Sequence, residues 1–268
     1  MVERPAWAPS HIDLTRPSAA RVYDYYLGGS HNLEVDRHLA REAIGLWPDL
    51  PMIMRANRAF LRRAVGYLLD QGVTQFLDIG SGIPTVGNVH DLVHAVDPRA
   101  GVVYVDNDPV AVAHSRAILD GRPHTAVVHG DLRAPERLLA DPELTRTIDL
   151  DRPVAVLLVA VLHFVPDADD PVGNVARLRD RLAPGSHLVV SHASAQGRPE
   201  VADSHRELYQ RTPTPMSMRD PDAIARFFQG FELVDPGLVW LPLWRPDDPA
   251  PIEHPERTTG FAGVGCRT

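Results

Sequence analysis

Cysteine is almost absent from this sequence. Among 268 residues only Cys266, close to the end, carries a thiol. A lone cysteine forms neither a disulfide framework nor a cysteine zinc site, so we expect neither. Long apolar runs are missing too, since the longest, residues 154–161, has only the length of a strand. A bilayer needs about 20 apolar residues, so we expect no membrane partner.

Positive charge is in deficit. The chain has 27 Lys and Arg against 35 Asp and Glu, which gives a net charge of −8 and a pI near 5.9. Proteins that grip nucleic-acid backbones use clustered Lys and Arg, so we expect no nucleic-acid partner. The first residues lack a charged start followed by an apolar stretch. We therefore expect no secretion signal and a cytoplasmic protein.

The most informative stretch is QFLDIGSG, residues 75–82. Its apolar run suits a parallel strand that is buried on both faces. Gly80 and Gly82 then allow a sharp turn and let a ligand approach where a Cβ would obstruct it. In open α/β sheets, ligands bind at the edge where such strands end. We therefore expect Asp78, Gly80, Ser81 and Gly82 to form the floor of a cofactor site.

The rest of the chain repeats the alternation of strand and helix. Expected strands are residues 75–79, 101–105, 126–129, 153–160 and 187–191. Short strands alternating with helices predict an α/β protein with a parallel sheet and right-handed crossovers. Residues 231–234 and 238–244 flank Pro236 and Gly237, which predicts an antiparallel hairpin at the sheet edge.

The glycine turn separates two classes of cofactor. A nicotinamide site has the pattern G-x-G-x-x-G, but here Thr85 stands in the place of the third glycine. In addition, Asp78 lies two residues before Gly80. A carboxylate has no use beside an anionic pyrophosphate, but it suits S-adenosylmethionine, which carries an ammonium and a sulfonium. The sequence therefore favours S-adenosylmethionine, with a nicotinamide dehydrogenase as an alternative.

Polar residues also follow the next two strands. Asp106 closes the second strand, where its carboxylate can accept both ribose hydroxyls, and Asn107 can line the adenine pocket. After the third strand, Asp131 can accept from the adenine amino group and Leu132 can supply apolar contact. An aspartate at a strand end usually caps a helix or a turn. Here, however, Asp78, Asp106 and Asp131 stand at three successive strand ends, and this joint occurrence favours the cofactor site.

These motifs carry a resemblance. The runs FLDIGSG (76–82), YVDNDP (104–109) and GD (130–131) resemble the class I S-adenosylmethionine-dependent methyltransferases. The runs ARVYDYYLGG (20–29) and GIPT (82–85) are similar to a little-characterised bacterial family of S-adenosyl methyltransferases. The resemblance implies a Rossmann-like sheet of seven mostly parallel strands, with the last strand antiparallel. It also implies that Asp78, Gly80 and Gly82 surround the methionine part of the cofactor, that Asp106 holds the ribose, that Asn107 and Asp131 hold the adenine, and that Ala160 faces the methionine backbone.

We divide the chain into three parts. Residues 1–54 are expected to form an extended arm and a helical cap, with helices over 18–27 and 34–45. Residues 55–245 are expected to form the S-adenosylmethionine-binding methyltransferase domain, and a helix expected over 53–71 spans its start. Residues 246–268 are a tail rich in proline and glycine, which we expect to be loosely held, with docking through Phe261 and Val264 as the alternative.

In methyl transfer the cofactor supplies the reactive group, so the protein mainly aligns the acceptor and excludes water. A general base is needed only when the acceptor must lose a proton. His163, which follows the fourth strand, is the first candidate for that base, with a packing role as the alternative. Tyr26 is the second catalytic candidate. It lies with Tyr23, His31 and Asn32 in a segment that either faces the acceptor or supports the cap.

Other features are weaker signals. Arg58 lies on a helix with several arginines and is our candidate for an anionic part of the cofactor. Asp167, Asp169 and Asp170 follow His163 and resemble ligands for Mg or Mn. A solvated loop in which Asp170 caps the next helix is the favoured interpretation, so we expect no metal.

The function that we predict is methyl transfer to a small-molecule acceptor. The acidic balance and two covering segments, residues 23–32 and 194–219, favour an enclosed site. A protein that binds S-adenosylmethionine without catalysis stays an alternative, because no acceptor-side group is certain from the sequence.

Overall fold

The computed structural model describes residues 14–84, 87–210, 212, 215–248 and 250–268. The predicted N-terminal arm lies almost wholly outside the described residues. Among the helices in the described ranges, none is long and apolar enough to span a membrane.

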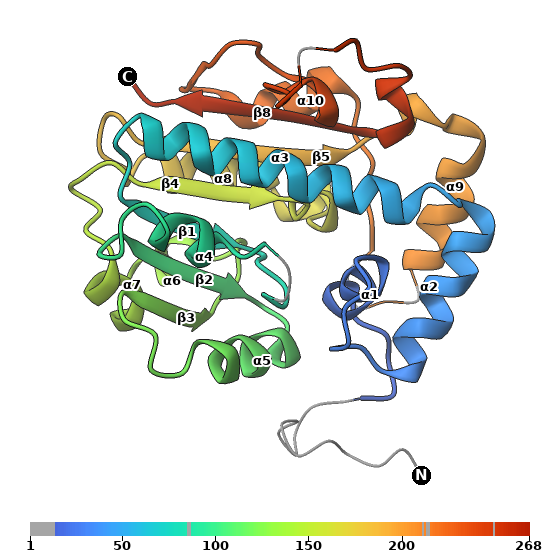
Figure 1. Cartoon of the computed structure of the whole chain (residues 1–268), viewed down its shortest axis with the longest axis horizontal. Helices are drawn as coiled ribbons and strands as arrows, with labels where there is room; N and C mark the ends of the chain where they lie inside the picture. Colours follow the sequence, from blue (N-terminus) through green and yellow to red (C-terminus); the bar gives the residue numbers. More distant parts are fainter. Residues whose placement is uncertain (1–13, 85–86, 211, 213–214, 249) are drawn as a thin grey trace.

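A mixed sheet runs through the centre of the molecule (Figure 1). Its parallel strands are β1 (Gln75–Ile79), β2 (Gly101–Asp106), β3 (Thr125–His129), β4 (Ala155–Val159) and β5 (His187–Ala193). The strand order is β3-β2-β1-β4-β5-β8-β6, with β7 paired to β8. The order reverses at β1, so the carboxyl ends of β1, β2 and β4 meet at one crevice, the usual ligand position in such sheets. The predicted α/β fold and mostly parallel sheet are confirmed.

The last strand is antiparallel, as predicted, but it lies later in the chain than expected. It is β8 (Gly260–Cys266), which pairs with β5 along its whole length. Strands β6 (Glu232–Leu233) and β7 (Val239–Trp240) pair with β8 and not with each other, so the predicted hairpin is wrong. The expectation of a loosely held tail is wrong for β8 as well, since this strand is almost entirely buried.

Glycines explain this error. A Cβ at Gly263 would lie 3.2 Å from Cζ of Phe228, and one at Gly265 would lie 2.8 Å from Cβ of Phe231. The strand therefore uses glycine because aromatic side chains lie against its backbone. The same glycines in the sequence favoured a loose segment.

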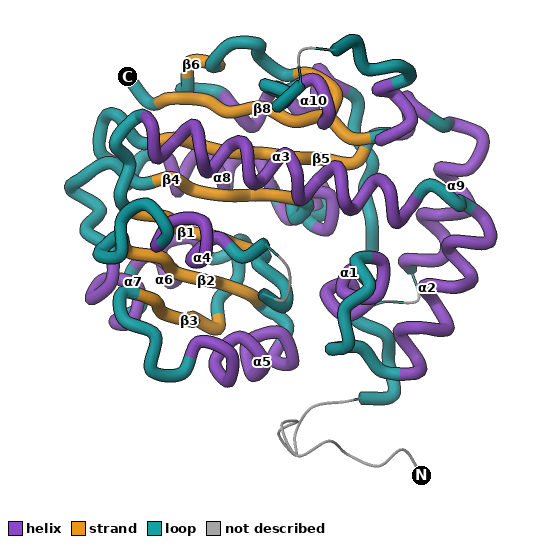
Figure 2. Tube along the Cα trace, in the orientation of Figure 1, coloured by secondary structure: helices purple, strands orange, loops and turns teal. Residues whose placement is uncertain are grey.

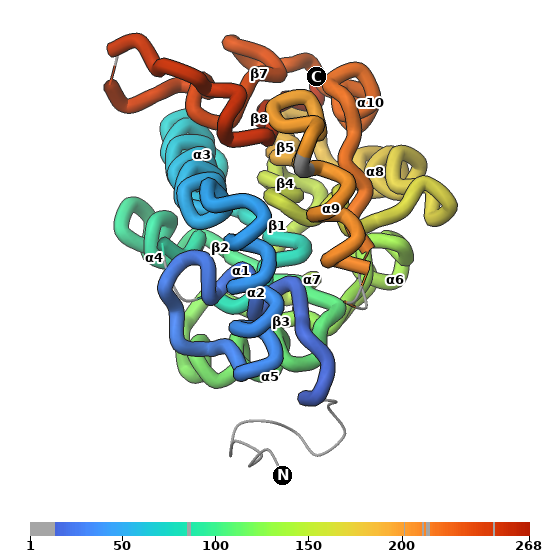
Figure 3. Tube along the Cα trace, turned by 90° about the vertical axis from the view of Figure 1, so that its right-hand side faces the viewer, coloured from blue at the N-terminus to red at the C-terminus, as the bar shows by residue number. Residues whose placement is uncertain are grey.

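Helices cover both faces of the sheet (Figure 3). One face carries α3 (Leu50–Asp70), α4 (Val89–His94) and α5 (Pro109–Leu119). The other carries α6 (Pro135–Leu139), α7 (Pro142–Thr147), α8 (Pro171–Arg179) and α10 (Pro221–Ala225). The helix expected over 53–71 corresponds to α3, whose Phe60, Ala64 and Leu68 are fully buried.

A helical cap stands beside the carboxyl ends of the parallel strands (Figure 2). It consists of α1 (Ala19–Tyr26), α2 (Glu34–Leu46), the start of α3, and α9 (Pro199–Tyr209). A buried ion pair joins its first two helices, with 2.6 Å between Nε of Arg21 and a carboxylate oxygen of Asp36. The cap thus includes a helix from the later covering segment, and α3 continues from the cap into the sheet layer across the expected boundary at residue 54.

Candidate functional site

A cavity of about 600 Å³ lies between the sheet edge and the cap. Sites for small molecules have volumes of about 300–1,000 Å³. The predicted site residues that line it are Arg58, Asp78, Gly80, Ser81, Gly82, Asp106, Asn107, Asp131, Leu132, Ala160 and His163. The fold thus brings every predicted cofactor residue to one cavity, together with the predicted base.

The glycine turn after β1 is held tightly. The backbone amides of Gly80 and Ser81 both donate to the carbonyl oxygen of Val105, at 2.8 and 3.1 Å. Gly80 has a φ of +72°, and a Cβ there would lie 2.2 Å from Cγ2 of Val161. Only glycine therefore fits this position, for both conformational and steric reasons.

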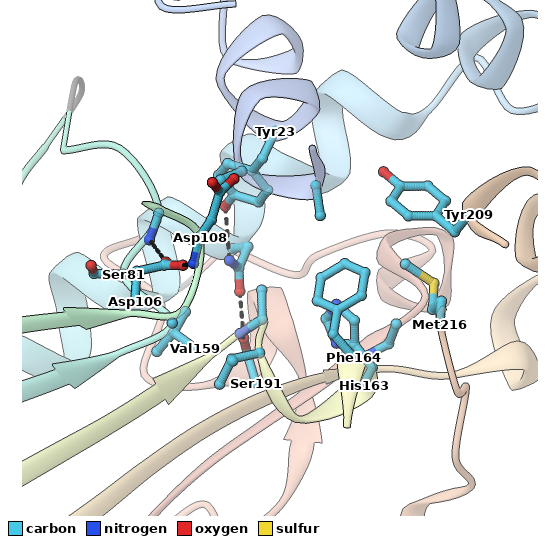
Figure 4. A pocket seen from close by; sticks show the side chains of 18 of the residues that line it. Tyr23, Ser81, Asp106, Asp108, Val159, His163, Phe164, Ser191, Tyr209 and Met216 are labelled. Carbon is cyan, nitrogen blue, oxygen red and sulfur yellow. Dashed lines mark hydrogen bonds between the residues drawn. The ribbon is translucent and has the colours of Figure 1, made fainter. Parts of the chain in front are cut away.

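Asp106 ties this turn to the end of β2 (Figure 4). One carboxylate oxygen accepts from the backbone amide of Gly82 at 2.7 Å, and the other accepts from the amide of Asp108 at 2.8 Å. Burial raises the pKa of Asp106 to about 6, although these two hydrogen bonds act to lower that pKa. A carboxylate has about four acceptor sites, so part of its acceptor capacity remains for a ligand.

Asp78 is a buried carboxylate that accepts no hydrogen bond from the part of the chain that the structure describes. Its side chain is 6 % exposed and lines the cavity, and no described residue donates to it. Burial raises the pKa of Asp78 to about 7, while the nearby charge of Arg58 lowers it. A buried acceptor without a partner fits a cationic group of a ligand, which would compensate the buried charge.

The rim near β3 contains an ion pair that the sequence did not reveal. Arg133 lies 2.6 Å from a carboxylate oxygen of Asp131 and 3.2 Å from one of Asp169. Asn107 donates to Asp131 at 3.5 Å. Burial alone would raise the pKa of Asp131, but its bonds to Arg133 bring that pKa below its usual value. Asp131 is therefore ionised and held in place at the rim.

A chain of hydrogen bonds links the sheet to the cap (Figure 4). The backbone amide of Ala160 donates to the hydroxyl of Ser191 at 2.9 Å, and this hydroxyl donates to Asn57 at 2.6 Å. The amide nitrogen of Asn57 then donates to the hydroxyl of Tyr23 at 2.9 Å. Because Ala160 has a φ of +59°, the chain also fixes an unusual backbone conformation at the end of β4.

His163 is oriented as a donor. Its Nδ1 accepts from the backbone amide of Ala193 at 3.3 Å, which places the proton on Nε2. Burial lowers the pKa of His163 well below its usual value, with the neighbouring His192 and Arg219 adding to the effect. The neutral ring therefore has its basic nitrogen engaged, which favours donation from Nε2 over a general-base role.

The structure does not bring Tyr26 to the cavity wall. Its hydroxyl lies 3.4 Å from that of Tyr209, which does line the cavity, and Tyr26 is 3 % exposed. His31 and Asn32 also hold the cap, because each donates to a carboxylate oxygen of Asp24 at 2.8 Å. Tyr23 is the member of this predicted group that reaches the cavity.

The carboxylates after His163 have other partners. Asp167 pairs with Arg219 at 2.6 Å, and Asp169 pairs with Arg133. Asp170 caps α8 as expected and accepts from the amide of Gly173 at 3.1 Å. Across the described ranges no group of three or more His, Cys, Asp or Glu is placed to hold a metal ion.

Two of the solved structures that resemble this chain are similar to it in sequence as well. A DUF574 family protein from Streptomyces avermitilis is 39 % identical, with a TM-score of 0.89 over 96 % of this chain and 99 % of that one. A protein from Thermobifida fusca, provisionally named a methyltransferase, is 41 % identical, with a TM-score of 0.91 over 98 % and 100 %. A more distant structure, TnmH, is 19 % identical with a TM-score of 0.50 over 92 % and 64 %, and shows likeness of fold alone.

A search of the curated proteins found no match. A family model described as S-adenosyl methyltransferase matches residues 5–268, which is nearly the whole chain. The glycine turn and the three strand-end carboxylates Asp78, Asp106 and Asp131 are thus in a chain whose family uses S-adenosylmethionine. The protein belongs to the S-adenosyl methyltransferase family and is an S-adenosylmethionine-dependent methyltransferase.

Proposed function

We propose that this methyltransferase acts on a small-molecule acceptor that enters the cavity between the sheet and the cap. One observation carries the proposal: the predicted cofactor residues occupy only part of a cavity of about 600 Å³. Apolar and aromatic side chains of the cap line the rest. A concave site of this volume suits a small molecule better than an extended polymer.

The chain's residues suit the cofactor in charge and shape. Asp78 would hold its ammonium group, since this buried carboxylate has no partner among the described residues. The free acceptor sites of Asp106 would hold the ribose hydroxyls. The remaining assignments are Asn107, Asp131 and Leu132 at the adenine, with Ser81, Gly80, Gly82, Ala160 and Arg58 around the methionine part. When bound, S-adenosylmethionine supplies an electrophilic methyl group.

The protein's own contribution is alignment and the exclusion of water. The cap closes the cavity opposite the strand ends, and Asn57 and Ser191 connect the two sides. His163 would donate a hydrogen bond from Nε2 to the acceptor and thereby orient it. Tyr26 would act at a distance by positioning Tyr209.

Turnover with separated cell extract tests the proposal. The extract is divided by ultrafiltration into small molecules and macromolecules, and formation of S-adenosylhomocysteine is measured with each fraction. The proposal expects turnover with the small molecules only. Turnover confined to the macromolecules would contradict it.

The same assay addresses the alternatives. A protein that only binds the cofactor would form no S-adenosylhomocysteine with either fraction, although it would bind that compound. Membership of an S-adenosyl methyltransferase family already contradicts the nicotinamide alternative. A cytoplasmic location stays a prediction from the sequence.

A further inference from the structure

The wall of the cavity divides by charge. Most charged residues that line the cavity lie outside the cap, on α3 and at or after the ends of the parallel strands. They are Arg58, Asp78, Asp106, Asp108, Asp131, Arg133 and Asp169. Those in the cap or just before it are Arg16, Arg21 and Asp24, of which Arg21 is paired with Asp36. The remaining cap side and the segment after β4 contribute uncharged residues: Trp47, Leu50, Ile53, Phe164, His205, Tyr209, Met216 and Met218.

Four of these residues form what we call the aromatic wall: Trp47, Phe164, His205 and Tyr209. Their rings contact one another in sequence. The ring centroids lie 5.3 Å apart for Trp47 and His205, 4.9 Å for His205 and Tyr209, and 5.9 Å for Phe164 and Tyr209. Figure 4 shows Phe164 and Tyr209 with Met216 on one side of the pocket, and Ser81 and Asp106 on the other. The rings are tilted or edge-on to one another, with interplanar angles of 77°, 50° and 34° in the same order. Aromatic rings pack against one another in such tilted and edge-on arrangements, so this wall suits an aromatic ligand.

The aromatic wall also contains polar atoms without partners. Both ring nitrogens of His205 and Nε1 of Trp47 are buried, and no described residue forms a hydrogen bond with them. The two side chains are 3 % and 1 % exposed. Buried polar atoms are nearly always paired, because leaving them unpaired costs free energy. Three such atoms beside one cavity therefore point to a ligand that pairs with them.

His205 differs from the other histidines of the cavity. Nδ1 of His163 accepts from the amide of Ala193. Both nitrogens of His192 are engaged, one with the carbonyl of Ala193 and one with Arg219 at 2.9 Å. His205 alone among these three retains a free basic nitrogen and a free N–H.

We propose that the acceptor is an uncharged, planar aromatic compound with at least one hydroxyl group, and that His205 recognises this hydroxyl. The inference rests on the proposed function. A hydroxyl both donates and accepts, which matches a neutral imidazole. Burial lowers the pKa of His205 to about 4, so the ring is neutral at physiological pH. The ring lies between Trp47 and Tyr209. Both its nitrogens are buried, so pairing with the acceptor requires the ring to turn towards the cavity.

Three probes of one shape test the proposal. Naphthalene, 2-naphthol and 2-naphthoate are titrated calorimetrically into protein saturated with S-adenosylhomocysteine. We expect 2-naphthol to bind at least tenfold more tightly than naphthalene, because only it can pair with His205. We also expect it to bind at least tenfold more tightly than 2-naphthoate, because the uncharged wall provides no cation for a carboxylate.

His205→Phe keeps a ring but removes both nitrogens. In this variant 2-naphthol should bind no better than naphthalene, while the affinity for naphthalene stays within about twofold of wild type. The matched control is His187→Phe. His187 is also buried with an unpaired Nδ1, but it does not line the cavity, so the preference for 2-naphthol should persist.

The outcomes separate this inference from the function on which it rests. Equal binding of 2-naphthoate, a preference for 2-naphthol that survives His205→Phe, or binding of no probe would overturn the inference. Failure to bind S-adenosylhomocysteine would instead contradict the proposed cofactor site. Retained S-adenosylhomocysteine affinity shows that a variant is folded. If His205→Phe loses that affinity, the preference for 2-naphthol is measured in Trp47→Phe, where it should fall.

Discussion

The carboxylate of Asp106 accepts a hydrogen bond from the backbone amide of Gly82 at 2.7 Å. One side chain at the end of β2 thereby fixes the glycine turn at the end of β1. It also lines the cavity in which the cofactor is proposed to bind. The shape of the turn and the recognition of the ribose are therefore coupled through Asp106.

Asp106→Asn should weaken S-adenosylmethionine binding at least tenfold. The amide keeps the size of the side chain but replaces one acceptor oxygen with a donor, which opposes either the Gly82 amide or a ribose hydroxyl. Calorimetric titration measures the effect. Asp141→Asn is the control, because Asp141 caps α7 and does not line the cavity. Wild-type affinity in Asp106→Asn would contradict the ribose assignment.

Asp78→Asn should stabilise the free protein at pH 8 and weaken cofactor binding. The pKa of Asp78 is raised from 3.8 to about 7 by burial. Between pH 3.8 and about pH 7, Asp78 is protonated in the native state and ionised in the unfolded state. The stability that this bound proton contributes is therefore lost as the pH rises towards 7. The variant should therefore gain up to about 4 kcal/mol in free energy of unfolding at pH 8, measured with urea.

The same substitution tests the ammonium assignment through pH. In the wild type, S-adenosylmethionine affinity should fall between pH 8 and pH 6, because Asp78 takes up a proton that the bound ammonium excludes. Asp78→Asn should show a weaker affinity that changes less over this range. An equally steep pH dependence in the variant would show that another group is responsible.

Gly80→Ala should destabilise the protein more than Gly72→Ala. Both glycines have positive φ, +72° and +77°, so both substitutions carry the left-handed strain of about 1–2 kcal/mol. Only Gly80 has a neighbour in the way, since Val161 would lie 2.2 Å from the new Cβ, whereas nothing lies within 4 Å at Gly72. Urea unfolding should give Gly80→Ala an additional loss of about 1–3 kcal/mol. Equal losses would mean that Val161 moves freely.

Ser191 and Asn57 should show strong energetic coupling. Ser191→Ala leaves buried acceptor and donor groups unpaired, and Asn57→Leu does the same, so each should cost about 1–3 kcal/mol in free energy of unfolding. The double variant should cost less than the sum, because the two groups that pair with each other are removed together. Additive losses would contradict the hydrogen-bond chain from β4 to the cap.

Much of the fold could be predicted because its signals are local. The strand before Gly80 and the carboxylates at successive strand ends lie within short stretches of sequence, and parallel topology brings them together. β8 was missed because Gly263 and Gly265 serve to admit Phe228 and Phe231, a long-range reason that composition does not show.

The missed parts of the site depend on distant pairs. Ser191 and Asn57 are 134 residues apart in sequence. His205 lies in a polar helix, and only its position beside Trp47 and Tyr209 singles it out. Conversely, Tyr26 was an attractive candidate within a tyrosine-rich helix, but the helix turns it towards the core of the cap.

Calorimetric titration with S-adenosylhomocysteine, S-adenosylmethionine and NADH, for wild type and Asp106→Asn side by side, is the most direct test of the central claim. The cofactor site described above predicts that wild type binds the first two compounds and not NADH, and that Asp106→Asn loses at least tenfold in affinity for both. Binding of NADH alone, or binding that is unchanged by the substitution, would contradict it.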